Sequence, residues 1–161
     1  MRIYVALENL RSLHNIGAIF RTCSFFGVHD VLLVGYSGKT KDTRGRDILH
    51  PDILKTSLGS EEGLNIKLLN TSADLVTFAS ENSLQLIAVE QASDQKKVIY
   101  LGRESLTKDC ILIFGNEVNG VSSELLCEAD HILEIKKLGL HNSLNVSTTC
   151  GIVLFQVTKN G

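Results

Sequence analysis

The chain has 161 residues, 43% of them hydrophobic and 21% charged, which is the balance of an ordinary globular domain with one substantial core. A single proline and the absence of low-complexity sequence argue against linkers or a disordered tail. The net charge of −2 excludes a uniformly basic nucleic-acid binder, so any contact with RNA has to use local clusters of positive charge.

The amino-terminal sequence does not predict a signal peptide, because Glu8 and Arg11 interrupt its apolar run. No later segment has the length and apolarity of a membrane span. The four cysteines are scattered, with apolar neighbours and without a Cys-x-x-Cys pair. We therefore expect buried, reduced thiols, no metal site, no membrane contact and a cytoplasmic location.

Runs of aliphatic and β-branched residues predict short strands, and apolar residues at helical spacing predict the helices between them. In chain order, we expect a strand at 3–7, a helix at 15–26 closed by Gly27, strands at 31–34 and 66–69, a helix at 73–82 capped by Ser72, strands at 84–90 and 110–114, a helix opened by Ser122 or Ser123, and a strand at 132–135. The polar segment 40–63 is predicted as a loop with a short helix near 51–58. The length of the last apolar segment, 143–157, favours a helix.

This alternation predicts an α/β fold for residues 1–161 as one domain, with a mostly parallel sheet and helices on both faces. Such sheets bind ligands beyond the carboxyl ends of their strands. The turns after Glu90, Phe114 and Ile135 are therefore expected to converge. A dinucleotide-binding Rossmann fold is a weaker alternative, because the turn at 10–17 lacks the Gly-x-Gly-x-x-Gly pattern.

Three polar clusters stand in otherwise apolar surroundings. The first contains Asn15 and Arg21, both within the first predicted helix. A guanidinium is suited to bind phosphate through two hydrogen bonds. Taken alone, Arg21 also fits an ordinary surface residue.

The second cluster, Gly115-Asn116-Glu117, follows a buried strand. Glycine there allows close approach to a ligand, and a helix dipole would stabilise the carboxylate of Glu117. The same residues also fit a simple tight turn between a strand and a helix.

The third cluster, Ser143-Leu144-Asn145, opens the last predicted helix. The polar loop before it can fold back over the Gly115 turn. Either Ser143 or Asn145 could also serve only as a helix cap.

In this order, the three clusters resemble the three motifs of the SpoU family of RNA 2′-O-ribose methyltransferases, within the SPOUT superfamily. The resemblance extends over about residues 8–155. It implies a C-terminal trefoil knot that binds S-adenosylmethionine, and a homodimer whose active sites draw on both subunits. Knots are exceptional among protein folds, and the knot expected here rests on the resemblance alone.

The resemblance also implies roles for individual residues. Arg21 would bind the phosphate beside the target ribose, and Glu117 would brace the site. The catalytic candidates are Asn15, Arg21, Glu117, Ser143 and Asn145. The candidates for binding S-adenosylmethionine are Val89, Glu90, Gln91, Gly115, Asn116, Ile135 and Leu144.

The implied partner is RNA, with tRNA favoured over rRNA for a chain of this size. The extra amino-terminal RNA-binding domain that some relatives carry is not expected here, so this domain and its symmetry mate are expected to hold the target. Two basic segments suit that role: Lys136-Lys137, which replaces the usual Pro-Met of the third motif, and residues 36–46, with Lys39, Lys41, Arg44 and Arg46 opposed by Asp42. On spacing alone, both also fit solvated surface charge.

Several alternative functions remain open at this point. The chain could methylate rRNA, or it could be a catalytically silent RNA-binding module on the same fold. An unrelated flavodoxin-like nucleotide binder would not need the Ser143-Leu144-Asn145 cluster. A base methyltransferase from another SPOUT branch is a further alternative.

Overall fold

The computed structural model describes residues 1–91 and 97–159, and a seven-stranded sheet is its central layer. All neighbouring strands in this sheet are parallel. In spatial order they are β5 (Asn65–Leu69), β2 (Asp30–Val34), β1 (Ile3–Glu8), β8 (Cys110–Phe114), β6 (Gln85–Val89), β9 (His131–Glu134) and β7 (Val98–Tyr100). The predicted α/β fold with a mostly parallel sheet is confirmed.

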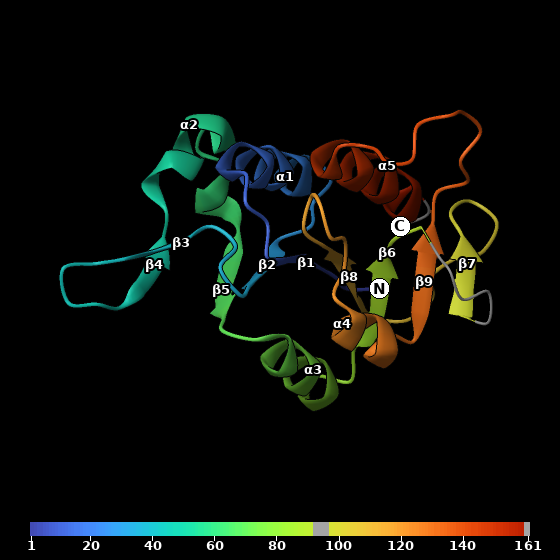
Figure 1. Ribbon diagram of the computed structural model, residues 1–161, viewed down its shortest axis with the longest axis horizontal. Helices are drawn as coiled ribbons and strands as arrows, with labels where there is room; N and C mark the ends of the chain where they lie inside the picture. Colours follow the sequence, from blue (N-terminus) through green and yellow to red (C-terminus); the bar gives the residue numbers. More distant parts are fainter. Residues whose placement is uncertain (92–96, 160–161) are drawn as a thin grey trace.

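Helices cover both faces of the sheet (Figure 1). The first face carries α1 (Leu13–Phe25) and α5 (Val146–Thr158), and the second carries α3 (Ser72–Glu81) and α4 (Ser123–Glu128). A separate cluster of buried apolar side chains fills each interface. Strands covered on both faces read as continuous apolar runs, which is why β8 is buried at every position. The trefoil knot stays a prediction, because strand order alone does not trace how the chain threads.

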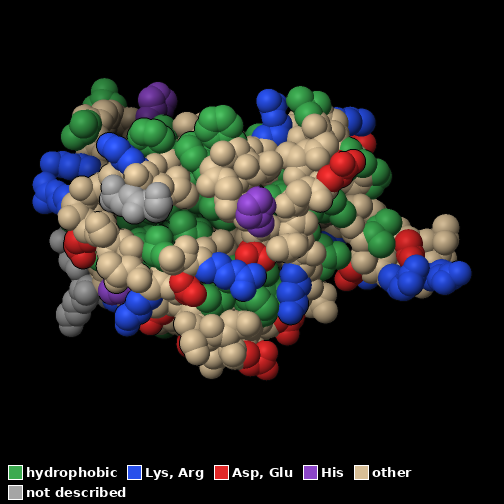
Figure 2. All heavy atoms as spheres, turned by 180° about the vertical axis from the view of Figure 1, so that it is seen from behind, with side chains coloured by type: hydrophobic (Ala, Val, Ile, Leu, Met, Phe, Trp, Pro, Cys, Tyr) green, Lys and Arg blue, Asp and Glu red, His purple; other side chains and the backbone are tan. Residues whose placement is uncertain are grey.

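The segment 40–63 has more regular structure than the single short helix that was predicted. It forms an antiparallel hairpin, β3 (Lys39–Lys41) with β4 (Asp47–Leu49), which projects from the body of the molecule (Figures 1 and 2). The short helices η1 (Pro51–Ile53), α2 (Leu54–Ser57) and η2 (Ser60–Gly63) follow. Strands this short and polar have no alternating apolar pattern that could reveal them in the sequence.

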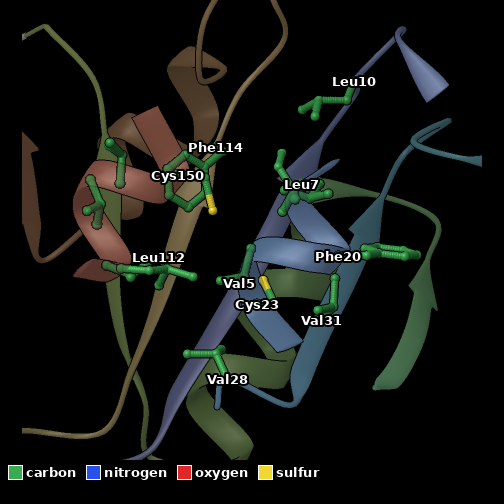
Figure 3. Close-up of a cluster of buried hydrophobic side chains, with 14 of the residues drawn as sticks. Val5, Leu7, Leu10, Phe20, Cys23, Val28, Val31, Leu112, Phe114 and Cys150 are labelled. Atoms are coloured by element: carbon green, nitrogen blue, oxygen red, sulfur yellow. The ribbon is translucent and has the colours of Figure 1, made fainter. Parts of the chain in front are cut away.

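Close packing fixes α1 between its neighbours. A Cβ atom at Gly17 would lie 2.8 Å from the carbonyl oxygen of Ile53, so only glycine lets α1 approach the α2 region this closely. On the other side of α1, Cys23 contacts Cys150 of α5, in the same buried cluster as Val5 and Leu112 (Figure 3). These contacts hold the two helices that carry the first and third polar clusters.

Two local expectations were wrong, and one strand was missed. α1 begins at Leu13, two residues before the predicted start, because the Ser12 side chain accepts a hydrogen bond from the Asn15 amide as the N-cap. α3 is capped by Thr71, not Ser72, in a capping box with Asp74. The strand β7 was not predicted, since its three residues are too few for periodicity to detect.

Of the four cysteines, three are buried as expected, but Cys127 is exposed on α4, so the expectation was wrong for that residue. Burial raises the pKa of Cys110 to about 12, which makes its thiol unreactive. Among residues 1–91 and 97–159, no helix is long and apolar enough to cross a membrane. The same residues contain no group of three or more side chains suited to hold a metal ion.

Candidate active site

The carboxylate of Glu117 connects the second polar cluster to the first. Glu117 follows β8, and its Oε2 accepts a hydrogen bond from the Arg11 amide at 3.0 Å. Its Oε1 accepts from the Ser12 amide at 3.0 Å and from the Asn15 side chain at 3.1 Å. These two amides lie immediately before α1, where backbone N–H groups have no partner within the helix, and a carboxylate placed there also suits the helix dipole. Glu117 therefore fixes the start of α1.

The environment of Glu117 keeps its carboxylate ionised. Partial burial alone would raise the pKa of Glu117, but the hydrogen bonds from the backbone amides and from Asn15 outweigh it. The pKa consequently lies below its usual range. A carboxylate held in this way is a weak base and a good structural brace.

The third cluster joins the same network through Asn145. Its side-chain nitrogen donates to the side-chain oxygen of Asn15 at 3.2 Å. Its own oxygen caps α5 by accepting from the Ser147 amide at 2.9 Å and the Thr148 amide at 3.4 Å. One chain of hydrogen bonds thus runs from Glu117 through Asn15 to Asn145, and it joins segments more than 100 residues apart.

The other two catalytic candidates lie outside this network. Ser143 is exposed in the loop before α5, and its hydroxyl has no hydrogen-bond partner among the described residues. Arg21 is exposed on α1, roughly 9 Å further along the axis than Asn15 and on another side of the helix. A single copy of the chain does not bring Arg21 to the Glu117–Asn15–Asn145 network.

A cavity of about 430 Å³ lies at the carboxyl ends of β6 and β9. Its walls are the turn after β6, the loop 135–144, Leu133 and Thr149. Among the cofactor candidates, those that line this cavity are Val89, Glu90, Gln91, Ile135 and Leu144. Its volume falls in the usual range for small-molecule sites, about 300–1,000 Å³. Two of the three turns expected to converge, those after β6 and β9, meet here, because the Gln91 side chain donates to the carbonyl of Ile135 at 3.0 Å.

Gly115 and Asn116 do not line this cavity. A Cβ atom at Gly115 would lie 2.2 Å from the backbone of Gly120, so glycine is required to close the turn itself. The Asn116 amide group is fully engaged within the protein: it donates to the carbonyl of Asn9 and the hydroxyl of Tyr36, and it accepts from the Val118 and Asn119 amides. Both residues shape the turn that presents Glu117.

Two carboxylates near this edge, one buried and one half-buried, have bracing roles that the sequence did not predict. Glu8 is 1% exposed and accepts hydrogen bonds from the Ser72 hydroxyl and the Ser122 amide, which ties β1 to α3 and α4. Glu90, a cofactor candidate, accepts from the Val121 amide at 3.1 Å and so links the turns after β6 and β8. A carboxylate ending an apolar strand was the only signal of such a brace in the sequence.

A larger hollow of about 830 Å³ lies at the opposite edge of the sheet, where Arg2, Asp30, Asp109 and Gln156 are among its lining residues. None of the candidate site residues lines it. Open parallel sheets bind ligands at their carboxyl edge, so the smaller cavity beside the polar network is the better candidate.

The fold and this edge define an α/β protein with a nucleoside-sized cavity beside a polar network built from three distant segments. The chain belongs to the SpoU rRNA Methylase family, whose model matches residues 2–155. Membership confirms the resemblance drawn from the three clusters.

The names of proteins with similar sequences and structures are consistent with this family. The chain is 32% identical over 158 residues to the tRNA (guanosine(18)-2′-O)-methyltransferase of Thermus thermophilus, covering 96% of this chain and 73% of that protein. It is 27% identical to the Escherichia coli enzyme of the same name, covering 96% of this chain and 62% of that protein. An AdoMet-bound rRNA methyltransferase from Sinorhizobium meliloti superposes with a TM-score of 0.82 at 26% identity, covering 99% of this chain and 56% of that one. The chain thus spans between about half and three quarters of the length of these relatives.

Proposed function

We propose that this protein transfers a methyl group from S-adenosylmethionine to the 2′-hydroxyl of a ribose in RNA, with tRNA preferred over rRNA. The observation that carries the proposal is the Glu117–Asn15–Asn145 network beside a cavity of suitable size. The names of the relatives from Thermus thermophilus and Escherichia coli favour tRNA. The expected cytoplasmic location stays part of the proposal.

The cavity suits S-adenosylmethionine. Apolar side chains of Val89, Leu133, Ile135 and Leu144 form walls for a flat adenine ring, and backbone groups of the turns after β6 and β9 border it. When bound, the cofactor supplies an electrophilic methyl carbon on a sulfonium centre. Gly115 and Asn116 contribute by holding the neighbouring turn, although they lie outside the cavity wall.

The hydroxyl of the target ribose has to be oriented and relieved of its proton. The side-chain amides of Asn15 and Asn145 are joined by a hydrogen bond, which sets the position of the start of α1 relative to the start of α5. The hydroxyl of Ser143 stays available to hydrogen-bond the ribose. Correct positioning of two reactants can lower a barrier by about 7–11 kcal/mol. Glu117 positions Asn15 and, being already bound by three donors, is not the general base.

Arg21 is assigned to the phosphate beside the target ribose and to the charge that develops on the ribose oxygen. Its guanidinium stays protonated, so it stabilises negative charge and does not accept the proton. Among the described residues its side chain has no hydrogen-bond or ion-pair partner, which leaves it available for RNA.

A homodimer would bring Arg21 to a site. Phe25 is 83% exposed and Phe155 is 57% exposed, and the rings of Phe25, Phe26 and Phe155 form a continuous apolar surface over α1 and α5. Exposed aromatic surface of this kind is typical of an interface. Arg21 lies four residues before Phe25, so it shares that side of α1. A dimer that buries Phe25 therefore carries Arg21 toward the partner's network.

The test is methyl transfer from S-adenosylmethionine with a labelled methyl group to unfractionated tRNA from cells that lack this protein. A 2′-O-methyl group prevents alkaline cleavage of the adjacent phosphodiester bond. Label in alkali-resistant dinucleotides supports the proposal. Label in alkali-sensitive nucleotides would identify a base methyltransferase instead. A protein that binds tRNA but neither binds S-adenosylmethionine nor transfers a methyl group would be a silent RNA-binding module.

A further inference from the structure

The β3–β4 hairpin is not used by the proposed active site. It projects beyond β5 at one end of the sheet, whereas the cavity lies between β6 and β9 toward the other end (Figure 1). Neither of its strands contains a buried residue. A two-stranded ribbon without a core of its own is marginally stable in water, so its projection from the body needs another explanation.

The hairpin concentrates positive charge. Residues 39–49 contain four cations and two carboxylates, a net charge of +2 in a chain whose net charge is −2. Lys and Arg side chains gather at the tip of the projection in Figure 2. The two carboxylates are each held by one cation, in the pairs Lys41–Asp47 at 2.5 Å and Arg46–Asp42 at 2.8 Å. Lys39 is used at the base, where its amine donates to the carbonyl of Leu69.

This pairing leaves Arg44 at the tip as the uncompensated cation. Its guanidinium has no partner among the described residues, and it is exposed. The exposed pairs beside it are also available to a ligand, because ion pairs at the surface contribute only about 0–1 kcal/mol. Phosphate can therefore recruit Lys41 and Arg46 at little cost.

Hydrogen bonds hold the tip in a defined turn, although it is exposed. The Asp42 side chain accepts hydrogen bonds from the Arg44 amide at 2.8 Å and the Arg46 amide at 2.9 Å. The Gly45 amide donates to the carbonyl of Asp42 at 3.0 Å, and Gly45 adopts the positive φ of +76° that this turn requires. A preformed turn loses little conformational entropy when it binds.

We propose that the β3–β4 hairpin is an RNA-binding arm that contacts the phosphate backbone of the substrate away from the methylated nucleotide, with Arg44 as its principal contact. The inference rests on the proposed function, because it takes RNA as the substrate. An isolated cationic arm with a preformed turn, on a protein whose net charge is −2, is complementary to a polyanion that is larger than the active site. Because the arm and the cavity lie toward opposite ends of the sheet, the contact adds affinity for a whole RNA and none for an isolated target loop.

The experiment measures binding of unfractionated tRNA, between 50 and 200 mM salt, by the full chain and by the variants Arg44→Ala, Arg44→Lys and Lys41→Ala/Arg44→Ala/Arg46→Ala. Each phosphate contact contributes about 0.7–0.9 to the slope of log affinity against log salt, so losing one should lower the slope by that amount and make the loss of affinity roughly threefold greater at 50 mM than at 200 mM salt. We expect about that loss for Arg44→Ala, a larger loss for the triple variant, and recovery with Arg44→Lys. Lys108→Ala, which removes an exposed cation far from the hairpin, is the matched control.

Affinity for S-adenosylmethionine should stay unchanged in all hairpin variants, which shows that they are folded. Hairpin variants that bind tRNA as tightly and with the same salt slope as Lys108→Ala would overturn the inference. So would an equal loss of affinity for a short stem-loop substrate, because the contact would then lie at the target. If the unmodified protein itself binds no tRNA and methylates none, the proposed function fails instead, and the two failures are distinguishable.

Discussion

Asn15 and Asn145 are 130 residues apart in the chain, yet their side chains form a 3.2 Å hydrogen bond that joins the start of α1 to the start of α5. The side-chain nitrogen of Asn15 donates to Glu117, so the Asn15 side chain connects all three polar clusters. The two helices also pack along their length through Cys23 and Cys150. The distance between the starts of α1 and α5 consequently depends on both the core packing and this polar contact.

Asn145 caps α5 and donates a hydrogen bond to Asn15, and substitutions should separate these two roles. Asn145→Asp keeps the oxygen that caps α5 but removes the nitrogen that donates to Asn15, so we expect near-normal stability and greatly reduced methyl transfer. Asn145→Ala removes both and should also lower the free energy of unfolding by about 1 kcal/mol. Urea denaturation and methyl-transfer rates measure the two effects. Ser122→Ala, which removes the cap of α4, is the control for a lost cap alone. Full activity of Asn145→Asp would contradict the role of the Asn15 contact.

The brace at Glu117 should make stability depend on pH in a defined direction. Its pKa is lowered in the folded protein, so its stabilising effect is fully present above the unfolded pKa of about 4.3 and is lost as pH falls through the lower folded value. Glu117→Gln should therefore be less stable than the unmodified protein at pH 7, by about 1 kcal/mol after allowing for solvent exposure. The difference should shrink toward pH 3. Thermal unfolding at both pH values tests this, and a difference that grows in acid would refute it.

Arg21 should be essential for methyl transfer but not for cofactor binding. Arg21→Ala is expected to lower the rate by at least about 100-fold, the usual cost of removing one group that stabilises developing charge. Its affinity for S-adenosylmethionine should stay normal. Arg103→Ala, an arginine that stacks on Tyr100 near β7, is the matched control and should be fully active. Activity retained by Arg21→Ala would remove Arg21 from the proposed site.

Heterodimers can show which subunit supplies Arg21. In a purified dimer of one Arg21→Ala chain and one Asn145→Ala chain, the two defects fall in the same site if Arg21 acts across the interface. The second site is then intact, and about half of the activity of the unmodified dimer should return. If Arg21 serves its own chain, both sites are defective and the heterodimer should be inactive.

The aromatic surface over α1 and α5 should hold the dimer together. Phe25→Asp places a charge on the most exposed aromatic side chain of that surface and should shift the protein to monomers in sedimentation experiments. Methyl transfer should fall with the dimer population, because Arg21 would no longer reach a partner. Leu54→Asp, at an exposed apolar position on α2, should leave the oligomeric state unchanged. A monomeric Phe25→Asp protein with normal activity would separate the dimer from the site.

Much of the secondary structure was predictable from the sequence. β8 was predicted to the residue, because a strand covered on both faces is a plain apolar run between polar turns. α5 was predicted from the length of its apolar segment alone. Asn145 caps this helix, which is one of the two roles that the sequence allowed for the residue. The Thr71 cap was missed although Asp74, three residues later, completes a capping box that the sequence displays.

Sequence alone determined most of the strands and helices of the main sheet and its covering layers, and the identity of the three clusters, because burial and capping act between residues that are close in the chain; the short strands β3, β4 and β7 were not determined in this way. Only the tertiary structure decided how the clusters meet. It joined Asn15 to both Glu117 and Asn145, turned Asn116 inward, left Arg21 outside the network, and paired Lys41 with Asp47 so that Arg44 remained the free cation of the hairpin. The order of parallel strands and the packing of α1 against α5 set those distances, and neither is written in any local pattern of residues.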